Sequence, residues 1–295
     1  MLIRKFAAID IGSNAVRLLL HNVIEQEDKE PRFKKSSLIR MPIRLGEDAF
    51  ISGKISKKNQ KRLHKAIQSY KLMMDVCGVE KYMACATSAM REAKNGNQIV
   101  EEIFKETGIK IDIIDGKREA TIIANTDLKE LIKVSHSYLY VDVGGGSTEF
   151  TVFEKGKVIV SKSFKIGTIR ILNNVVKKEV WQEINTWVTA NVPSNSKIEI
   201  IGSGGNINKL HKMSGRKVGQ PLSVIWLNSQ YHFLNQMNYE DRITKLGLNQ
   251  DRADVIVPAT KIFLSAAKWS GAKKIHVPKI GLSDGMIKTM YYQKD

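Results

Sequence analysis

Residues 7–20 read AAIDIGSNAVRLLL, and residues 138–153 read YLYVDVGGGSTEFTVF. Each stretch is an apolar strand that ends in an aspartate, followed by a turn of small residues and a second strand with apolar residues at alternate positions. Glycine has no Cβ, so such a turn allows backbone N–H groups to converge on an anion. The sequence therefore predicts one structural unit used twice, with an anion-binding turn in each copy.

The aspartate before each turn predicts a metal ion beside the anion. A carboxylate does not bind phosphate, but Mg²⁺ is held by one or two carboxylates together with waters and phosphate oxygens. We expect the two turns to face each other and to hold a phosphate and a Mg²⁺ between them. The turn residues are Gly12, Ser13 and Asn14 after Asp10, and Gly144, Gly145, Gly146 and Ser147 after Asp142.

Other glycine-rich motifs agree less well with the flanking sequence. A dinucleotide-binding turn opens a helix, whereas residues 148–153 (TEFTVF) alternate as a strand does. A P-loop requires Gly-Lys followed by Ser or Thr, and the chain contains no such tripeptide. An ordinary β-hairpin is an equal alternative for either turn alone, but the matched aspartates disfavour it for the pair.

Length and composition predict a soluble cytoplasmic protein. The 295 residues suggest about two domains, and no apolar run reaches the ~18 residues of a membrane span. The stretch after Arg4 and Lys5 is too short for a signal peptide. Cys77 and Cys85 lie in apolar surroundings without zinc-site spacing, so we expect two buried free thiols.

The formal net charge is +17, and the densest positive charge lies in residues 49–74, which hold seven Lys or Arg and no acid. Apolar residues recur there at helical spacing, which predicts an amphipathic helix ending near Gly78. The charge is either a solvated face or a field that steers a polyanion. A nucleic acid would respond to the same charge, but no interleaved aromatics or nucleic-acid-binding motif supports one.

The first half is expected to be α/β. Strands are predicted at about 3–11, 15–24, 32–41, 81–86 and 109–114, with a turn over 86–91. Asn97 is expected to cap a helix that ends at Gly108, and a further helix is expected from Lys117 to about Ile132. The domain border should therefore lie near 117–137.

The second half is expected to restart with a hairpin over 138–162 and a later strand near 197–201, which leads into Gly202-Ser203-Gly204-Gly205-Asn206 and a short helix to Met213. Pro258 should cost or kink a turn of a helical stretch over 252–270. The remaining predicted elements are helices near 168–176, 180–190 and 227–236, a strand at 274–277, and a last helix after Ser283-Asp284-Gly285.

The ordered set of motifs resembles the exopolyphosphatase/guanosine-pentaphosphate phosphatase family (Ppx/GppA) of the actin–Hsp70–sugar-kinase superfamily, essentially from end to end. The matching segments are Asp10–Asn14, Arg44-Leu45-Gly46, Ala86–Arg91, Gly116–Ala120, Asp142–Glu149, Gly202–Gly205, Arg252-Ala253-Asp254 and Asp284-Gly285. The resemblance implies two ribonuclease-H-like α/β domains with a cleft between them, over residues 1–128 and 129–295. It allows the last helix to pack back on the first domain.

The resemblance also implies roles for individual residues. Glu119 falls at the catalytic glutamate, where an ionised carboxylate orients or deprotonates the attacking water. Arg91 falls at a phosphate-binding arginine, whose guanidinium donates two parallel hydrogen bonds, and Arg44 is a weaker candidate. Asp142 and Glu149 would hold Mg²⁺, with Asp10 close by. Without the family, Glu119 would be taken for a solvent-facing residue, Arg91 for a partner of Glu92, and Glu149 for an ordinary strand carboxylate.

Three positions depart from the family pattern. Arg118 stands where many relatives have a second acid, which bears on metal affinity, and Ser283 replaces an arginine often found before the final Asp-Gly. The loop at Gly204-Gly205-Asn206 is one of several variants and does not decide whether a guanosine binds.

The implied function is hydrolysis of a terminal phosphoanhydride of polyphosphate or guanosine pentaphosphate, with Mg²⁺ as cofactor and water activated by Glu119. Such a reaction demands positioning and charge neutralisation more than covalent chemistry. The alternatives are a non-catalytic sensor of guanosine tetra- or pentaphosphate and a small-molecule kinase of the same superfamily. The resemblance allows a homodimer, and the sequence leaves the choice of substrate open.

Overall fold

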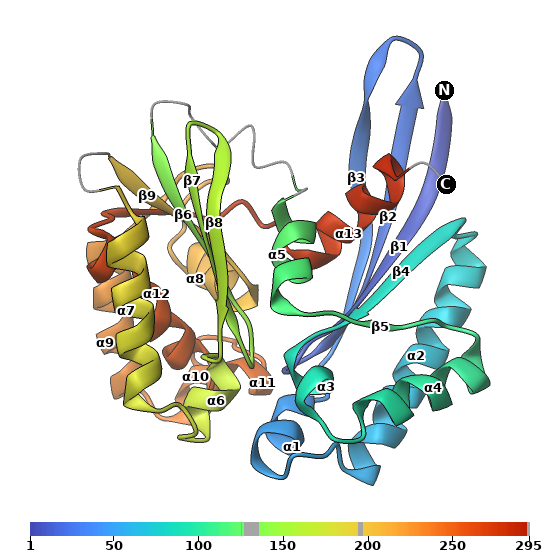
Figure 1. The fold of residues 1–295 in the computed structure, drawn as a ribbon, viewed down its shortest axis with the longest axis horizontal. Coiled ribbons are helices and arrows are strands. Elements are labelled where there is room, and N and C mark those ends of the chain that lie inside the picture. The colour runs from blue at the N-terminus through green and yellow to red at the C-terminus, as the bar shows by residue number, and fades with distance from the viewer. Residues whose placement is uncertain (125, 127–135, 194–196, 294–295) are drawn as a thin grey trace. The chain divides into compact units, whose positions relative to one another are not determined.

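The computed structural model of the chain describes residues 1–124, 126, 136–193 and 197–293. The chain divides into two compact units (Figure 1). Unit 1 comprises Met1–Thr126 and Leu282–Asp295, and unit 2 comprises Asp127–Gly281. The domain border predicted after residue 128 falls outside the described residues.

Unit 1 contains a five-stranded sheet with the order β3-β2-β1-β4-β5. Its first three strands form an antiparallel meander, and β4 and β5 run parallel to β1. The first four predicted strands are confirmed, whereas the strand predicted over 109–114 is only two residues long. The bounds are β1 Leu2–Ile11, β2 Val16–Gln26, β3 Lys29–Met41, β4 Lys81–Ala86 and β5 Asp112–Ile113.

Side chains of β1 alternate between the two faces of this sheet. Ala7, Ile9 and Ile11 belong to the apolar core shared with α2 (Lys57–Cys77) and α4 (Gly96–Thr107). On the opposite face, Phe6 contacts the ring of Tyr291 in α13 (Leu282–Tyr292). Helix α13 packs on β1, β4 and α5 (Gly116–Ala124), so the last helix of the chain belongs to unit 1. Asp10 shares the parity of Phe6 and therefore points toward the face covered by α5 and α13.

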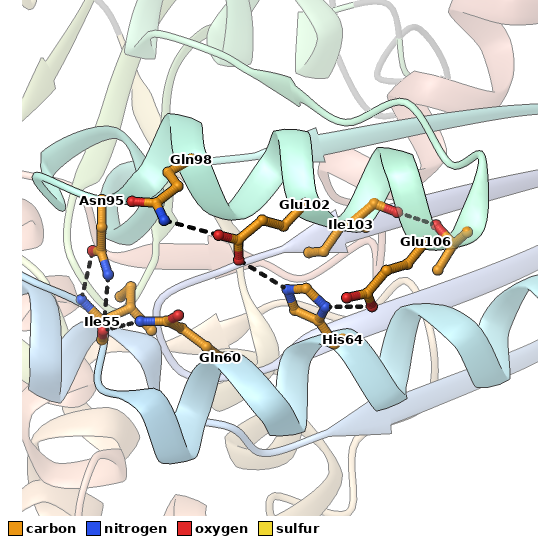
Figure 2. Close-up of polar contacts among 9 residues, drawn as sticks. Ile55, Gln60, His64, Asn95, Gln98, Glu102, Ile103 and Glu106 are labelled. Carbon is orange, nitrogen blue, oxygen red and sulfur yellow. Dashed lines mark hydrogen bonds and ion pairs between the residues drawn. The ribbon is translucent and has the colours of Figure 1, made fainter.

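The basic helix predicted before Gly78 is α2, and Gly78 ends it in a left-handed conformation. The segment predicted as a turn over 86–91 instead contains the short helix α3 (Ser88–Glu92). Helix α4 begins after Asn95 rather than after Asn97. The amide group of Asn95 exchanges two hydrogen bonds with the backbone of Ile55 (Figure 2), so this residue links the loop before α2 to the start of α4 instead of capping with its side chain.

Helix α5 begins at Gly116, and residues 125 and 127–132 of the helix predicted to reach Ile132 lie outside the described residues. The remaining helix of unit 1 is α1 (Leu45–Ile51). Helix α13 begins at Leu282, so the Ser283-Asp284-Gly285 segment forms its first turn instead of preceding it. A Cβ on Gly285 would lie 2.1 Å from the carbonyl oxygen of Ile122, which explains the glycine at this crossing of α13 and α5.

Unit 2 repeats the strand order of unit 1. Its sheet reads β10-β11-β9-β6-β7-β8, in which β6, β7 and β8 form an antiparallel meander and β9 and β11 run parallel to β6. Only the edge strand β10 has no counterpart among the described strands of unit 1. The bounds are β6 Ser137–Val143, β7 Thr148–Glu154, β8 Lys157–Phe164, β9 Ile198–Ser203, β10 Leu222–Ser223 and β11 Lys274–His276.

Seven helices accompany this sheet in the described part of unit 2: α6 Thr168–Leu172, α7 Lys178–Asn191, α8 Gly205–Met213, α9 Val224–Gln236, α10 Tyr239–Thr244, α11 Gln250–Ala253 and α12 Ile256–Ser270. The helical stretch predicted over 252–270 is interrupted at Asp254 and Val255, between α11 and α12, so the expectation that Pro258 costs a turn of helix is confirmed. Pro258 lies in the first turn of α12, where its missing N–H has no helical partner to lose.

The shared order, a three-stranded antiparallel meander followed by two parallel strands, is the ribonuclease-H-like arrangement. The α/β fold class with two such domains is therefore confirmed. The cleft expected between the domains stays a prediction. In the part of the chain that the structure describes, no helix is both long enough and apolar enough to cross a bilayer.

Candidate functional site

The turn after β1 is fixed by the starts of two helices. The Gly12 N–H donates to the Ala15 carbonyl (3.1 Å), which closes the turn. The Gly46 N–H of α1 donates to the Ser13 carbonyl (2.8 Å), and the hydroxyls of Ser13 and Ser88, both buried, lie 3.0 Å apart. A Cβ on Gly46 would lie 2.9 Å from the Ser13 Cβ, so only glycine permits this approach. Three separate sequence motifs thus meet at one turn.

Asp10 is a paired carboxylate at the end of β1. It lies opposite Arg17 in the antiparallel register, and the Arg17 Nη1 donates to its Oδ2 at 2.8 Å. Asp10 is only 4% exposed, and the Arg17 guanidinium balances its negative charge. The sequence predicts that Asp10 is a carboxylate available to a metal, whereas in the structure the Arg17 guanidinium already binds it and would compete with a metal.

Arg91 and Glu119 are connected through the segment that follows β5. The Arg91 Nη1 donates to the Ile114 carbonyl (2.6 Å), and the Asp115 side chain accepts from the Arg118 N–H (2.7 Å) at the start of α5. The Asp115 carbonyl accepts from the Glu119 N–H (3.0 Å). Arg91 thereby braces the loop from which the helix carrying Glu119 begins.

Glu119 is 8% exposed, so the solvent-facing interpretation is wrong. Cys85 indicates where Glu119 lies, because the Glu119 charge acts on its thiol. In the sheet register, Cys85 of β4 lies beside Asp10 of β1 and beside Asp112 of β5. Burial, together with the negative charges of Asp112, Asp10 and Glu119, raises the pKa of the Cys85 thiol to about 12. The carboxylates of Asp10 and Glu119 therefore both act on the sheet face that carries Cys85. Cys85 is buried as expected, whereas Cys77 is only half-buried.

In unit 2, the glycine turn after β6 is held by its carbonyl groups. The carbonyls of Gly144 and Gly145 accept from the N–H groups of Thr168 (3.0 Å) and Ile169 (2.9 Å) at the start of α6. The Gly146 carbonyl accepts from the Nε of Arg170 (2.6 Å), whose side chain is buried. Three successive carbonyls of the turn are thus directed at α6.

This arrangement sets the direction of the turn's amides. In a planar trans peptide the N–H points opposite to the C=O, so the amides of Gly145, Gly146 and Ser147 point away from α6. No described residue accepts a hydrogen bond from these three backbone amides. Amides that share a direction are the donors that an anion-binding turn uses, and anion binding by this turn stays a prediction.

The sequence-based reasoning missed Gly167 and Arg170. A Cβ on Gly167 would lie 2.4 Å from the carbonyl carbon and oxygen of Gly145 and 2.5 Å from the nitrogen of Gly146. Gly167 therefore lets α6 begin directly against the turn. The available signal was the segment Gly167-Thr168-Ile169-Arg170 at the end of a strand, where a glycine precedes a helix start.

Asp142 and Glu149 are direct cross-strand neighbours in the β6–β7 ladder, so their side chains project from the same face of the sheet. Glu149 is 2% exposed, and its Oε1 accepts from the hydroxyls of Ser147 (2.7 Å) and Ser163 (2.8 Å). An ordinary strand carboxylate would be solvated. Glu149 is instead buried, accepts two hydrogen bonds and lies beside the carboxylate of Asp142.

The residues around Asp142 fit a hydrated Mg²⁺. Gly204 has a φ of 111°, and a Cβ there would lie 2.8 Å from the Val143 carbonyl and 3.5 Å from the Asp142 Oδ1. The backbone of the loop before α8 therefore leaves space beside the Asp142 carboxylate. Two carboxylates suffice for Mg²⁺ because waters and phosphate oxygens complete its shell. Among the described residues, no group of three or more His, Cys, Asp or Glu is placed to hold a metal.

The positions that depart from the family pattern differ in their surroundings. Arg118 is exposed in the first turn of α5, and its N–H is the donor to Asp115. Ser283 is 8% exposed in the first turn of α13.

The predicted phosphate and metal residues form two groups, one in each unit: Asp10, Gly12, Ser13, Asn14, Arg91 and Glu119 in unit 1, and Asp142, Gly144, Gly145, Gly146, Ser147 and Glu149 in unit 2.

Comparison with known proteins gives relatives along nearly the whole chain. It is 28% identical over 299 residues to the bifunctional 3-dehydroquinate synthase/phosphatase of Fusobacterium nucleatum, a match that covers 90% of this chain and 43% of that protein. The chain thus spans less than half the length of that relative. It is 23% identical over 304 residues to exopolyphosphatase 1 of Mycobacterium tuberculosis, which covers 96% of this chain and 87% of that protein.

Two solved structures share the fold. An exopolyphosphatase from Cytophaga hutchinsonii has a TM-score of 0.85 at 23% identity, with 97% of each chain covered. The Aquifex aeolicus member of the Ppx/GppA family has a TM-score of 0.78 at 22% identity, with 100% of each chain covered. The family description "Ppx/GppA phosphatase family" matches residues 24–293. With the repeated sheet order and the two glycine turns, this match shows that the chain belongs to the Ppx/GppA phosphatase family.

Proposed function

We propose that this protein hydrolyses the terminal phosphoanhydride of inorganic polyphosphate or of guanosine pentaphosphate and releases orthophosphate. Family membership supports an exopolyphosphatase-type phosphatase. The observation that carries the proposal is the glycine turn of unit 2, whose carbonyls are tied to α6 while three backbone amides point the other way. Such a surface would bind the terminal phosphate group, which polyphosphate and guanosine pentaphosphate share, and would not distinguish the rest of the substrate.

Glu119 is proposed as the residue that orients and deprotonates the attacking water. Its support is its burial on the face of the unit 1 sheet that also carries Asp10, together with the bracing of its helix start by Arg91 and Asp115. A carboxylate held in place in this way can present water in line with the bond that breaks. The Arg91 guanidinium is proposed to offset charge on the transferred phosphoryl group.

Asp142 and Glu149 are proposed to hold Mg²⁺, which would neutralise charge on the phosphate oxygens as the bond breaks. Within this pair, Asp142 is the more exposed carboxylate and the natural direct ligand. Glu149, fixed by the hydroxyls of Ser147 and Ser163, keeps its ligand geometry without rearrangement. The ion pair with Arg17 makes Asp10 a positioning residue in this proposal, not a third ligand.

The test is phosphate release with Mg²⁺ from short polyphosphate, long polyphosphate and guanosine pentaphosphate, measured side by side. Glu119→Gln should fold normally and bind substrate but lose ~10²–10⁴ of kcat, because it removes the proton acceptor and keeps the shape. Glu101→Gln on the exposed face of α4 makes the same chemical change and should leave kcat unaltered. Unchanged turnover of Glu119→Gln would remove Glu119 from the mechanism, and no release from any substrate would refute the function.

A further inference from the structure

The outward face of α2 carries positive charge that the fold does not use. Lys57, Lys58, Lys61, Lys65 and Lys71 are exposed, and none of them has an ion-pair partner among the described residues. Lys57, Lys61 and Lys65 follow one another at i, i+4 spacing and form a single row. We call these five residues the lysine face. Along the axis of α2 they extend over about 21 Å, at 1.5 Å per residue.

This charge pattern opposes helix stability. Like charges four residues apart repel each other, and the pairs Lys57–Lys61 and Lys61–Lys65 are both of this kind. Cations in the first turn also oppose the helix dipole, and α2 begins with two lysines and no acid. A row that costs the folded state free energy and serves no contact within the described chain is more simply explained by a ligand.

The nearby carboxylates are engaged elsewhere. Glu102 and Glu106 of α4 turn toward His64 and Gln98, with 2.7 Å between the His64 Nδ1 and the Glu106 Oε2 (Figure 2). Asp48 accepts from the N–H and hydroxyl of Ser56 and from the Asn59 amide at the start of α2. The lysine face therefore keeps its charge for an external anion.

The lysine face begins close to the glycine turn of unit 1. Helix α1 connects the two, because Gly46 at its start bonds to Ser13, and Asp48, also in its first turn, bonds to Ser56 and Asn59. Exposed Lys54 lies between α1 and α2, and Lys57 and Lys58 follow it as the first residues of the lysine face. The remaining lysines follow along α2.

We propose that the lysine face binds the distal part of a long polyphosphate chain whose terminal phosphoanhydride is the bond hydrolysed, and that it thereby sets a preference for long chains. This inference rests on the proposed function and adds the substrate class. A flexible polyanion matches a row of exposed cations along a helix by charge alone, and the field also raises its rate of encounter. Guanosine pentaphosphate is too short to use the row.

Two other polyanionic partners fit less well. Binding of single-stranded nucleic acid relies on exposed aromatic side chains for base stacking, and the outward face of α2 has none. An anionic membrane is bound by a basic helix that buries its apolar face in lipid. The apolar face of α2, with Leu63, Ile67 and Tyr70, is already buried against the sheet.

The test compares two variants that lose the same charge. The first is Lys57→Gln/Lys61→Gln/Lys65→Gln on the lysine face. The control is Lys157→Gln/Lys178→Gln/Lys217→Gln, three exposed lysines of unit 2. With long polyphosphate as the substrate, the KM of the first variant should be on the order of tenfold higher than that of the wild type. This KM should also depend less on the salt concentration, because fewer ionic contacts remain for salt to screen. Its kcat, and its KM for tripolyphosphate, should change less than about twofold, within the range of surface substitutions. The control should behave as wild type.

An equal rise of KM in both variants, or an equal rise for tripolyphosphate and long chains, would overturn the proposal. Direct binding of long polyphosphate to the full chain without Mg²⁺ separates it from the proposed function. If no substrate is hydrolysed but only the first variant loses polyphosphate binding, the lysine face stands and the hydrolase proposal fails. Duplex DNA and vesicles of phosphatidylserine and phosphatidylcholine serve as competing partners, and binding of either in preference to polyphosphate would also overturn it.

Discussion

Gly167→Ala probes the contact that orients the glycine turn of unit 2. The new Cβ would lie 2.4 Å from the Gly145 carbonyl carbon and oxygen, where ordinary contacts begin at 3.4 Å. Relief of this overlap requires the turn and α6 to separate by about 1 Å. A misplacement of about 1 Å in a positioned group costs on the order of 10²-fold in rate. Overpacking of this size also costs about 1–3 kcal/mol of stability.

The assay is Mg²⁺-dependent phosphate release from polyphosphate, together with urea unfolding of each variant. Gly156→Ala is the matched control, because Gly156 has a φ of 78° and no atom within 4 Å of an added Cβ. Its strain of about 1–2 kcal/mol should lower stability and leave kcat unchanged. A folded Gly167→Ala protein with the wild-type kcat would refute the assignment of the turn amides to phosphate binding.

Three further predictions concern titration, thiol reactivity and the metal. Burial lowers the pKa of His21 from 6.5 to about 4, so protonation favours the unfolded chain. The stability is therefore complete above pH 6.5 and falls toward pH 4, by about 2 kcal/mol at pH 5. Urea unfolding of His21→Gln should lack this part of the pH dependence, and an unaltered slope would contradict the assignment. Because burial raises the pKa of Cys85 to about 12, a thiol reagent should label the half-buried Cys77 and leave Cys85 intact in the native protein, as peptide mapping would show. Asp142→Asn should raise the Mg²⁺ concentration for half-maximal phosphate release at least tenfold, by analogy with losses at metal sites, and an unchanged requirement would exclude Asp142 as a ligand.

The sequence predicted the repeated fold well because both signals are local. Alternation of apolar residues defined β1, β2, β6 and β7, and small residues after an aspartate marked both turns. Local signals were weaker where packing decides the outcome. The start of α4 moved from Asn97 to Asn95 because the Asn95 side chain bonds to Ile55, a residue 40 positions away.

The candidate site divides in the same way. Residue type and spacing indicated the two glycine turns with Asp10 and Asp142, because backbone amides and carboxylates have the same chemistry wherever they lie. The roles of Arg91, Glu119 and Glu149 came only from the resemblance to the family. Burial of Glu119, the pairing of Asp10 with Arg17 and the fixing of the turn carbonyls by α6 depend on segments far apart in the chain. The sequence by itself thus determined which chemical groups are present. Only the tertiary structure decided which carboxylates are paired with a cation and which turn amides point away from α6, because both follow from contacts that no local pattern encodes.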